Sequence, residues 1–557
     1  MLLSGADILV KTLIEQGCDT VFGYPGGQIL NVYDSLYKYR NEINHVLTAH
    51  EQGAAHAADG YARTTGKVGV VISTSGPGAT NLVTGIATAY LDSIPMVAIC
   101  GNVPTTQIGT DSFQEVDITG ITLPITKHNY FVNSVEDLAD TIREAFRLAK
   151  SGRPGPVLID VPKDVQIAEC EYEKQAPVEK EKPFAAKDTR IEEAAEIINS
   201  AKRPFIYFGG GVIASDAQEE VLKLAERIDA PMGCSLMGLS AIPTDHPRFL
   251  GMQGMHGHYA SSMSMHNADV IISLGVRFND RVTGNREKFA TGARIVHIDT
   301  DGSELNKTVN SVCGLRGDVK LTLQKLLPLL NEDKKSEWMA RVDAFRKEEE
   351  TYLDNREGLT PRRAVLTLNK HLGKNTAVCT DVGQHQMWAA QSLDFKTSRR
   401  FASSGGLGTM GYGLGAAIGA AYGTGERSVL ITGDGSFGMN LNEMATAVRY
   451  NIPVVVIVMN NGVLGMVRQW QTLFYDKHYS NSVLERKTDF TALARAFGAD
   501  GEAVSTPEEL DESLAHAFKA EGLYIIDCKI DKDEFVLPML PPGGSMDDII
   551  TKIEVEL

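Results

Sequence analysis

Short runs of β-branched and other apolar residues, separated by helical patterns, constrain the fold of this sequence more than any other feature. Strands that are apolar on both faces are typical of parallel sheets covered by helices on each side. We therefore expect an α/β protein with doubly wound parallel sheets. The predicted strands lie in the runs VGVVIST (68–74), MVAIC (96–100), PFIYFGGG (204–211), DVIISLG (269–275), ARIVHID (293–299), SVLITGDGS (428–436), PVVVIVMNN (453–461) and LYIIDCKI (523–530).

The chain has 557 residues, which is too long for one hydrophobic core. Two charged segments, 170–190 and 333–363, have the composition of linkers, and the second begins with a pattern typical of a solvated helix. These cuts predict three domains, at 1–169, 190–332 and 364–540, followed by a tail at 541–557. Each domain should be doubly wound, with its ligand site at the carboxyl ends of the strands.

Composition argues against nucleic acid as a partner and against a membrane span. Acidic residues outnumber basic ones by 71 to 54, giving a formal charge of -17, which disfavours nucleic acid as a partner. An anionic substrate would then need a local basic site. The glycine-rich segment 405–423 is the closest approach to a long apolar run, and it predicts a loop and a tightly packed helix. We therefore expect no membrane span.

The cysteines and the start of the chain indicate the compartment. The seven cysteines are scattered and form no CxxC pair, so neither a disulfide framework nor structural zinc is expected. The first residues predict an amphipathic helix rather than a signal peptide. A cytoplasmic protein fits both observations.

The strongest local motif runs from GDGS at 433–436 to NN at 460–461. Each half follows an apolar strand, so Asp434 and Asn461 should converge where two strands end. Their oxygen atoms suit a hard ion such as Mg²⁺, and the glycines let backbone N–H groups approach phosphate oxygens. The alternative is a turn that uses GDG for its geometry alone.

The GDG-to-NN arrangement resembles the cofactor motif of thiamine-diphosphate enzymes. The resemblance implies that Asp434, Asn461 and the backbone carbonyl of Val463 bind the metal ion. It implies further diphosphate contacts from Gly435 and Ser436. The block 364–540 would then be the diphosphate-binding domain.

The segment HEQGAAHAADGYAR at 50–63 resembles the part of the same family that carries a glutamate against the cofactor pyrimidine. That carboxyl bonds nitrogen N1′ and makes the 4′-imino group of the cofactor the base for its own C2 proton. Glu51 is the matching residue, and an apolar surround would raise its proton affinity. An ordinary helix-capping charge is the alternative. The resemblance makes 1–169 the pyrimidine-binding domain and implies a dimer, because the glutamate and the metal site come from different subunits.

Further segments resemble acetohydroxyacid synthases over nearly the whole chain. The most specific are GMHGHYASSMSMHNADVIISLGVRFNDRVTGN (254–285) and GMVRQWQTLFY (465–475). The resemblance implies an enzyme that decarboxylates one 2-keto acid and joins the remaining two-carbon unit to a second. It also implies a homodimer or homotetramer with a small regulatory subunit. Ser112, and Gly-Gly-Ser at 543–545, depart from the family pattern.

The middle block, 190–332, carries the pieces of an FAD site in this family. Gly209, Gly210 and Gly211 follow a strand and would let backbone approach a phosphate, although a plain turn is the alternative. The histidines at 256, 258 and 266 have poor spacing for zinc. The resemblance adds the following residues to the flavin site: Arg153, His256, Gly275, Arg277, Asp280, Arg281, Val282, Asp299 and Asp318.

Three residues are the main candidates for handling substrate. Arg281 could bind the carboxylate of the second 2-keto acid through two hydrogen bonds from its guanidinium group. The alternative is a surface ion pair. Trp470 could give the extra methyl of 2-ketobutyrate an apolar wall, the alternative being plain packing. Gln114 could bond a developing oxyanion. By resemblance, further pocket and cofactor contacts come from Gly27, Phe113, Lys163 and Met466.

Three other functions remain open at this point. A flavin-using oxidase such as pyruvate oxidase would share the thiamine scaffold. A catabolic acetolactate synthase would need no flavin, although the flavin segment at 277–284 argues against it. A non-catalytic homologue is the third, and the intact Glu51, Asp434 and Asn461 argue against it.

Overall fold

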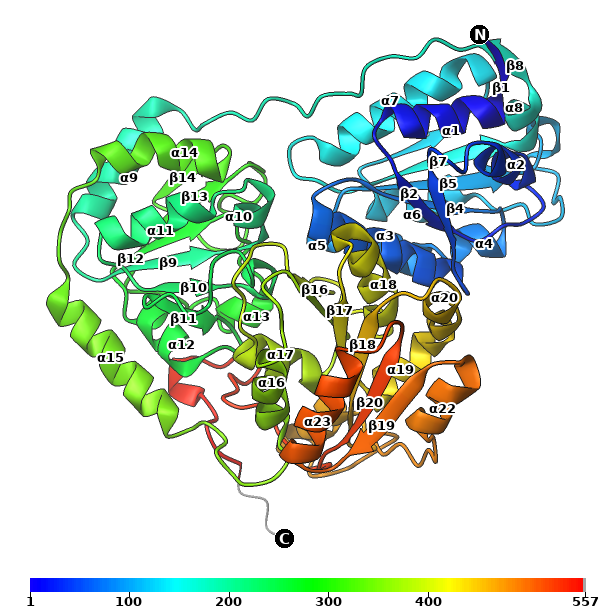
Figure 1. The fold of residues 1–557 in the computed structure, drawn as a ribbon. Helices are drawn as coiled ribbons and strands as arrows, with labels where there is room; N and C mark the ends of the chain where they lie inside the picture. The colour runs from blue at the N-terminus through cyan, green and yellow to red at the C-terminus, as the bar shows by residue number, and fades with distance from the viewer. Residues whose placement is uncertain (554–557) are drawn as a thin grey trace.

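The computed structural model describes residues 1–553 and contains three parallel β-sheets of six strands each, covered by helices on both faces (Figure 1). The N-terminal domain lies at the upper right of Figure 1, the central domain at the left and the C-terminal domain at the lower right. This arrangement confirms the predicted α/β fold class with three doubly wound domains.

In the N-terminal sheet, every pair of neighbouring strands is parallel. In spatial order its strands are β3 (Asn44–Leu47), β2 (Thr20–Gly23), β4 (Gly69–Ser73), β5 (Met96–Asn102), β7 (Pro156–Pro162) and β6 (His128–Phe131). Its helices are α1 (Gly5–Glu15), α2 (Leu30–Lys38), α3 (Glu51–Thr65), α4 (Pro77–Thr80), α5 (Val83–Asp92), α6 (Ile118–Thr122), α7 (Val135–Lys150) and α8 (Lys163–Ile167). A separate antiparallel pair joins β1 (Leu2–Ser4) to β8 (Glu169–Glu171).

The central sheet has a different strand order. Its strands are β11 (Phe249–Met252), β10 (Met232–Cys234), β9 (Pro204–Phe208), β12 (Val270–Leu274), β13 (Arg294–Asp299) and β14 (Cys313–Arg316). Numbered within the domain, this is the order 3-2-1-4-5-6 of dinucleotide-binding folds. Its helices are α9 (Asp188–Asn199), α10 (Gly210–Ala214), α11 (Gln218–Arg227), α12 (Tyr259–His266), α13 (Asp280–Thr283) and α14 (Val319–Leu326).

The C-terminal sheet repeats the strand order of the N-terminal sheet. Its strands are β16 (Phe401–Ser403), β15 (Ala377–Thr380), β17 (Ser428–Gly433), β18 (Val454–Asn460), β20 (Tyr524–Lys529) and β19 (Asp500–Val504). Its helices are α16 (Pro361–Asn369), α17 (Gln384–Ser392), α18 (Gly413–Thr424), α19 (Asp434–Asn440), α20 (Met444–Arg449), α21 (Gly465–Phe474), α22 (Phe490–Phe497) and α23 (Pro507–Ala517).

The segments between domains run along the outside of the molecule. The first linker crosses from the N-terminal to the central domain along the top of Figure 1, and α15 (Ser336–Glu350) leads from the central to the C-terminal domain. One face of α15 is buried, because Trp338, Val342 and Phe345 pack into the core of the central domain. The expectation of a solvated helix was therefore wrong on that face.

Close packing of α3 against α18 joins the N-terminal and C-terminal domains. A Cβ atom on Gly60 would lie 2.2 Å from the carbonyl oxygen of Ala416, and one on Gly419 would lie 1.8 Å from that of Ala57. The two helix backbones therefore approach more closely than any residue with a side chain would allow. The loop and packed helix predicted for 405–423 correspond to the segment before α18 and to α18 itself.

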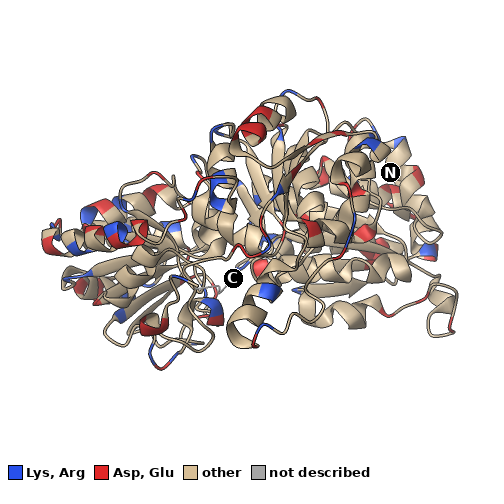
Figure 2. Ribbon diagram, turned by 90° about the horizontal axis from the view of Figure 1, so that it is seen from below, with Lys and Arg blue, Asp and Glu red and all other residues tan. Residues whose placement is uncertain are grey.

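Acidic and basic residues are interspersed on helices and loops in the view of Figure 2. Within residues 1–553, none of the helices combines the length and the apolar composition that crossing a membrane requires.

Candidate functional site

The GDG and NN segments meet where two neighbouring strands end. β17 ends at Gly433 and β18 at Asn460, and the two strands pair in parallel. The Asp434 carboxylate accepts a hydrogen bond from the backbone N–H of Asn461. The side-chain oxygen of Asn461 in turn accepts from the backbone N–H of Val463 at 3.2 Å. The three residues predicted for the metal site therefore lie together at one corner of the sheet.

This corner fits a divalent cation. Burial raises the pKa of Asp434 to about 6, and among the described residues this carboxylate forms no ion pair. A buried carboxylate without a cation is costly, so a metal ion would stabilise its charged form. The available donors are a carboxylate, an amide oxygen and a backbone carbonyl, and oxygen ligands of this kind suit Mg²⁺.

Gly435 and Ser436 form the first turn of α19 beside this corner. A Cβ atom on Gly435 would lie 2.8 Å from the end of the Leu464 side chain, so any larger residue here would displace that side chain. The Ser436 hydroxyl accepts a hydrogen bond from the backbone N–H of Gly411 at 3.1 Å. The loop before α18 is thereby tied to the turn predicted to hold the diphosphate.

Gln384 and His385 belong to the same corner, and the sequence reasoning missed them. They follow β15, the strand beside β17, and begin α17. The Gln384 side-chain oxygen lies 3.4 Å from Nδ2 of Asn461. Burial lowers the pKa of His385 to about 3, and its Nε2 atom has no hydrogen-bond partner among the described residues. Their place after a buried strand, at the edge where α/β sheets bind ligands, was the signal that could have found them.

Met466 and Trp470 lie one helical turn apart on α21, which begins beside the corner. Both side chains are partly exposed, and the Trp470 ring packs edge-on against Phe474 with the centroids 5.5 Å apart. A Cβ atom on Gly465 would lie 1.9 Å from the Gln384 side-chain oxygen and 3.0 Å from the Asn461 side chain, so α21 begins in close contact with the corner. The two predicted pocket residues are therefore placed next to the corner.

Glu51 begins α3 in the N-terminal domain. The His50 side chain caps this helix by accepting from the backbone N–H of Gln52. Glu51 is buried, and its carboxylate accepts a hydrogen bond from the Asn81 side chain at 3.0 Å. It forms no ion pair in the part of the chain that the structure describes. An enclosed carboxyl without a cation fits a group that shares a proton with a ring nitrogen.

The other predicted residues of this domain lie at the same edge of its sheet. Lys163 donates to the backbone carbonyl of Gly27 at 3.3 Å. Gln114, with a φ of 63°, packs against Gly76 in the loop that follows β4. Phe113 beside it is 83% exposed. The side chains of Phe113 and Gln114 are thus not packed into the core of their own domain.

Glu51 and the metal corner are not brought together within one chain. No hydrogen bond or ion pair in residues 1–553 joins Glu51 to Asp434. Asp434 begins α19, whereas Glu443, just beyond the end of α19, accepts bonds from the backbone N–H groups of Ala49 and His50. At 1.5 Å per residue α19 is about 10 Å long, so Glu51 and Asp434 lie towards its opposite ends.

Glycines from two neighbouring strands of the central domain meet where its strand order reverses, which is the place of the ligand crevice in folds of this kind. Gly209, Gly210 and Gly211 follow β9, and Gly275 follows the adjacent β12. The backbone N–H of Gly211 donates to the Gly275 carbonyl at 2.9 Å, and a Cβ atom on Gly211 would lie 2.5 Å from the Gly275 Cα. Dinucleotides bind at such a crevice in folds of this strand order.

Charged groups around the crevice fit a dinucleotide. Arg153 forms an ion pair with Glu304 at 3.0 Å. Arg277 donates to the carbonyl of Leu91 but has no carboxylate partner among the described residues, and burial together with Arg153 lowers its pKa. Burial also raises the pKa of Asp299, at the end of β13, to about 6. An unpaired guanidinium suits a phosphate, and a carboxyl at this strand end suits ribose hydroxyls.

Asp318 has a local role in the structure. It follows β14, the strand beside β13, and its side chain caps α14 by accepting from the backbone N–H of Leu321 at 3.0 Å. Asp318 nevertheless lies at the same end of the sheet as Asp299, because β14 pairs with β13 up to Asp299.

The chain's C-terminal segment covers His256. The backbone N–H of Leu540 donates to the carbonyl of Met255 at 2.7 Å, and Gln391 donates to the carbonyl of His256 at 2.9 Å. Burial lowers the pKa of His256 to about 4, and its Nδ1 atom lacks a partner in the described residues. His256 is therefore a neutral ring that lies against α17 and the segment directly before the tail.

Arg281 lines a pocket between α13 and the tail, together with Met255, Leu540 and Pro541. Arg281 is 60% exposed, and its ion pair is a long contact of 3.9 Å to the exposed Asp280. Its guanidinium is therefore available to an anionic ligand. The last four residues of the predicted tail, 554–557, lie outside the described residues.

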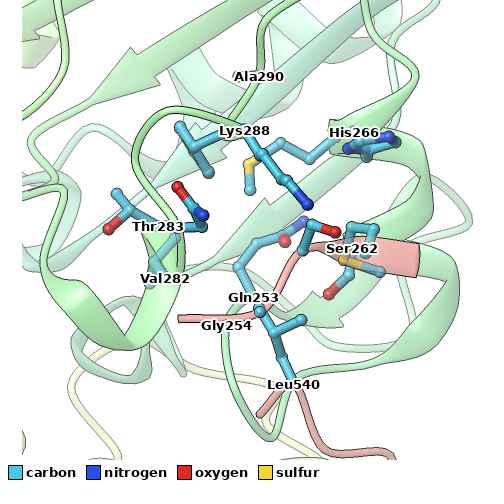
Figure 3. Close-up of a pocket in the computed structure, with 15 residues that line it drawn as sticks. Gln253, Gly254, Ser262, His266, Val282, Thr283, Lys288, Ala290 and Leu540 are labelled. Carbon is cyan, nitrogen blue, oxygen red and sulfur yellow. The ribbon is translucent and has the colours of Figure 1, made fainter. Parts of the chain in front are cut away.

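A second pocket, which shares Leu540 with the first, is lined by the buried Val282 (Figure 3). Its wall joins residues of the central domain to Leu540 and to the tail residues Gly544, Ser545 and Met546. Figure 3 shows the Lys288 side chain extending into the space between Thr283 and His266. The segment predicted to hold the flavin thus surrounds a pocket that the tail closes.

Comparison with known proteins agrees with this architecture. Models of thiamine pyrophosphate enzymes match the N-terminal TPP binding domain at residues 3–121, the central domain at 191–326 and the C-terminal TPP binding domain at 381–528. The fold and the site thus define a three-domain thiamine pyrophosphate enzyme.

Curated relatives narrow the class. The chain is 45% identical to a probable acetolactate synthase large subunit of Methanocaldococcus jannaschii, covering 100% of this chain and 96% of the relative. It is 42% identical to the acetolactate synthase isozyme 3 large subunit of Escherichia coli, covering 98% of each, and 44% identical to the acetolactate synthase large subunit of Corynebacterium glutamicum, covering 98% and 90%. The chain belongs to the acetolactate synthase large subunit family, which confirms the predicted resemblance.

Proposed function

We propose that this chain is the catalytic subunit of an acetohydroxyacid synthase. It would convert two pyruvate molecules into 2-acetolactate, or pyruvate and 2-ketobutyrate into 2-aceto-2-hydroxybutyrate, for valine, leucine and isoleucine biosynthesis. The observation that carries the proposal is the oxygen-lined corner formed by Asp434 and Asn461, in a chain similar to acetolactate synthase large subunits along its full length. The proposed domain limits are 1–169, 190–332 and 364–540.

The corner would hold Mg²⁺ and the cofactor diphosphate. Asp434, Asn461 and the carbonyl of Val463 would bind the metal ion, with Gly435 and Ser436 against the phosphate oxygens. When bound, thiamine diphosphate supplies the nucleophilic carbon and the electron sink for decarboxylation. Glu51 would hold a proton at the pyrimidine nitrogen, in surroundings that exclude water.

The central crevice would hold FAD as a structural group, since the overall reaction transfers no net electrons. Arg277 would neutralise phosphate charge, and Asp299 would bond ribose hydroxyls. The Arg277 guanidinium, which has no carboxylate partner in residues 1–553, and the glycine-lined turns support this assignment. His256, Asp280 and Val282 would line the ring end of the site, beneath the tail.

Substrate handling is assigned to side chains with free polar groups. Arg281 would bind the carboxylate of the second 2-keto acid, because its guanidinium lines a pocket and has only two long contacts among the described residues, to Asp280 and to the Met255 sulfur. Gln114 would bond developing negative charge on oxygen, and Lys163 would orient the same loop region. Trp470 would form the apolar wall that favours 2-ketobutyrate.

The proposal includes partners and a compartment. Because Glu51 and Asp434 lie towards opposite ends of α19, each active site would combine Glu51 of one subunit with Asp434 of the other. The minimal active unit would then be a homodimer, and a homotetramer would contain two such dimers. The relatives are named large subunits, which supports a small regulatory partner. A biosynthetic enzyme of this kind would work in the cytoplasm.

The test is acetolactate formation from pyruvate by purified protein with thiamine diphosphate and Mg²⁺, with and without FAD. Product that requires FAD is the expected result. Product without any flavin would indicate the catabolic enzyme instead. Oxygen uptake driven by pyruvate would indicate a flavin oxidase, and full cofactor binding without turnover, even with the regulatory subunit added, would indicate a non-catalytic homologue.

A further inference from the structure

Glu443 is a carboxylate of the C-terminal domain that is fully buried against the N-terminal domain. It ends the short turn (Leu441–Glu443) that follows α19. Its oxygens accept hydrogen bonds from the backbone N–H groups of Ala49 at 3.1 Å and His50 at 2.9 Å. The Thr446 hydroxyl supplies a third bond at 2.6 Å. Two of its three partners therefore belong to the residues directly before Glu51.

Three of the four backbone N–H groups from Leu47 to His50 donate to side chains of the C-terminal domain, whereas that of Thr48 donates to the Gly23 carbonyl of its own sheet at 3.2 Å. The backbone N–H of Leu47 donates to the Tyr450 hydroxyl at 2.9 Å, while those of Ala49 and His50 donate to Glu443. Backbone donors in a buried turn need acceptors, and this turn has none from its own sheet at these positions. The two residues directly before Glu51, Ala49 and His50, are thus held by the other domain, while Thr48 is held by its own sheet.

The sequence around Glu51 leaves room for this contact. A Cβ atom on Gly53 would lie 2.1 Å from the nearer oxygen of Glu443, so the carboxylate reaches the helix start only because residue 53 is glycine. Burial raises the pKa of Glu443, three hydrogen bonds oppose that rise, and the nearby Glu51 carboxylate adds to it. The two acids are therefore close enough for the charge on one to act on the other.

We propose that Glu443 is a positioning residue for Glu51, holding the backbone ahead of it so that the Glu51 carboxyl meets the cofactor pyrimidine in one orientation. The catalytic part of this inference rests on the function proposed above. Glu443 does not touch substrate or cofactor in this assignment. It acts through the two N–H groups that it accepts.

The test compares Glu443→Gln with Tyr450→Phe as a matched control. Glutamine keeps the size of the side chain, but its NH₂ group faces one of the two N–H donors and cannot accept from it. Phenylalanine removes the acceptor of Leu47 in the same turn, farther from Glu51. The first measurement is amide hydrogen exchange of residues 46–56 in the cofactor-free protein, and the second is kcat and KM for pyruvate in the loaded enzyme.

Glu443→Gln should speed exchange at Ala49 and His50 by about tenfold or more, as expected when a bond to a charged acceptor is lost. It should lower kcat by a similar factor and change KM by less than about twofold, because orientation is lost rather than substrate binding. Tyr450→Phe should speed exchange at Leu47 alone and leave kcat within about twofold. Melting temperatures of both variants report whether they fold.

Two outcomes would overturn the proposal. Unchanged exchange at Ala49 and His50 would show that Glu443 does not hold this turn. Faster exchange with unchanged kcat would show a brace between domains with no effect on Glu51. Measuring kcat as CO₂ release keeps the comparison valid if wild-type protein decarboxylates pyruvate without forming acetolactate, a result that would reject the proposed function alone.

Discussion

Arg63 joins two buried carboxylates at the junction of the N-terminal and C-terminal domains. Its Nε atom lies 2.5 Å from Asp59, one helical turn earlier on α3, and an Nη atom lies 2.8 Å from Asp92 at the end of α5. The side chains of all three are 5% exposed or less. The substitution Arg63→Met would fill most of the volume and leave both carboxylates without their cation.

The cost can be worked from the partners that remain. Breaking a buried ion pair by removing one member costs about 3–5 kcal/mol. Asp59 would keep the Tyr412 hydroxyl at 2.6 Å, and Asp92 would keep the N–H groups of Gly405 and Gly406 at 3.0 and 2.7 Å. These donors favour the lower end, about 3 kcal/mol, which corresponds to a fall in melting temperature of about 6–12 °C for a domain of this size.

Thermal unfolding followed by circular dichroism would measure this effect. The control is Arg147→Met, because Arg147 pairs with Glu144 at the surface, where such pairs contribute about 0–1 kcal/mol. Adding Asp92→Asn to Arg63→Met removes one uncompensated charge and should restore part of the loss. If Arg63→Met lowers the melting temperature no more than the control does, the reasoning from buried charge is refuted.

Three further substitutions follow from burial, packing and pocket shape. Burial raises the pKa of Asp160 to about 7. Between about pH 4 and pH 7 the folded protein therefore holds a proton that the unfolded chain releases, and the free energy of unfolding falls as the pH rises through this range. Asp160→Asn should therefore gain stability relative to wild type between about pH 5 and pH 8, by up to about 4 kcal/mol, and a parallel pH dependence would contradict this. Gly419→Ala should lower the free energy of unfolding by about 1–3 kcal/mol because it forces α3 and α18 apart. The control Gly292→Ala, with open space around its Cβ, should lower it little, and equal melting temperatures of the two variants would contradict the close approach of the helices. Trp470→Leu should change the preference for 2-ketobutyrate over pyruvate by about tenfold or more in competition assays, and an unchanged ratio would remove Trp470 from the pocket wall.

The elements that could be predicted from sequence are those with a local pattern. Each predicted apolar run contains a strand, because a strand buried on both faces must be apolar along its length. Ten of the eighteen strands in the three sheets were not predicted. The strands β10 and β16 have three residues each, too few to show a period, whereas β7 is a buried run of seven residues that was overlooked. The burial of α15 was missed for a different reason. Trp338, Val342 and Phe345 have helical spacing, but the many charged residues around them dominated the segment's composition.

The candidate site divides in the same way. Asp434 and Asn461 were predictable because a strand end fixes where each side chain begins, and parallel pairing brings the two ends together. The involvement of Glu443 depends on how one domain docks on another, and no pattern near residue 443 records what lies 393 positions away. Buried polar groups that find partners across domains are visible only when the partners are in place.

Glu51 and Asp434 pose a test of whether one chain can form a complete site. They lie towards opposite ends of α19, and Glu443 holds the Glu51 turn at the far end from the metal corner. If each site takes Glu51 from one subunit and Asp434 from the other, then Glu51→Gln and Asp434→Asn variants should each be inactive. A hybrid of the two would carry one site with both native residues and one with neither.

Mixing equal amounts of the two variants, unfolding and refolding them together should therefore restore activity. Random pairing makes about half of the dimers hybrids, and each hybrid has one of its two sites intact, so about one quarter of wild-type activity is expected. Each variant refolded alone is the control, and wild-type protein taken through the same cycle corrects for losses. A mixture as inactive as its components would mean that Glu51 and Asp434 act within the same chain, which would require the N-terminal and C-terminal domains to dock differently from the arrangement that α3, α18 and Glu443 define.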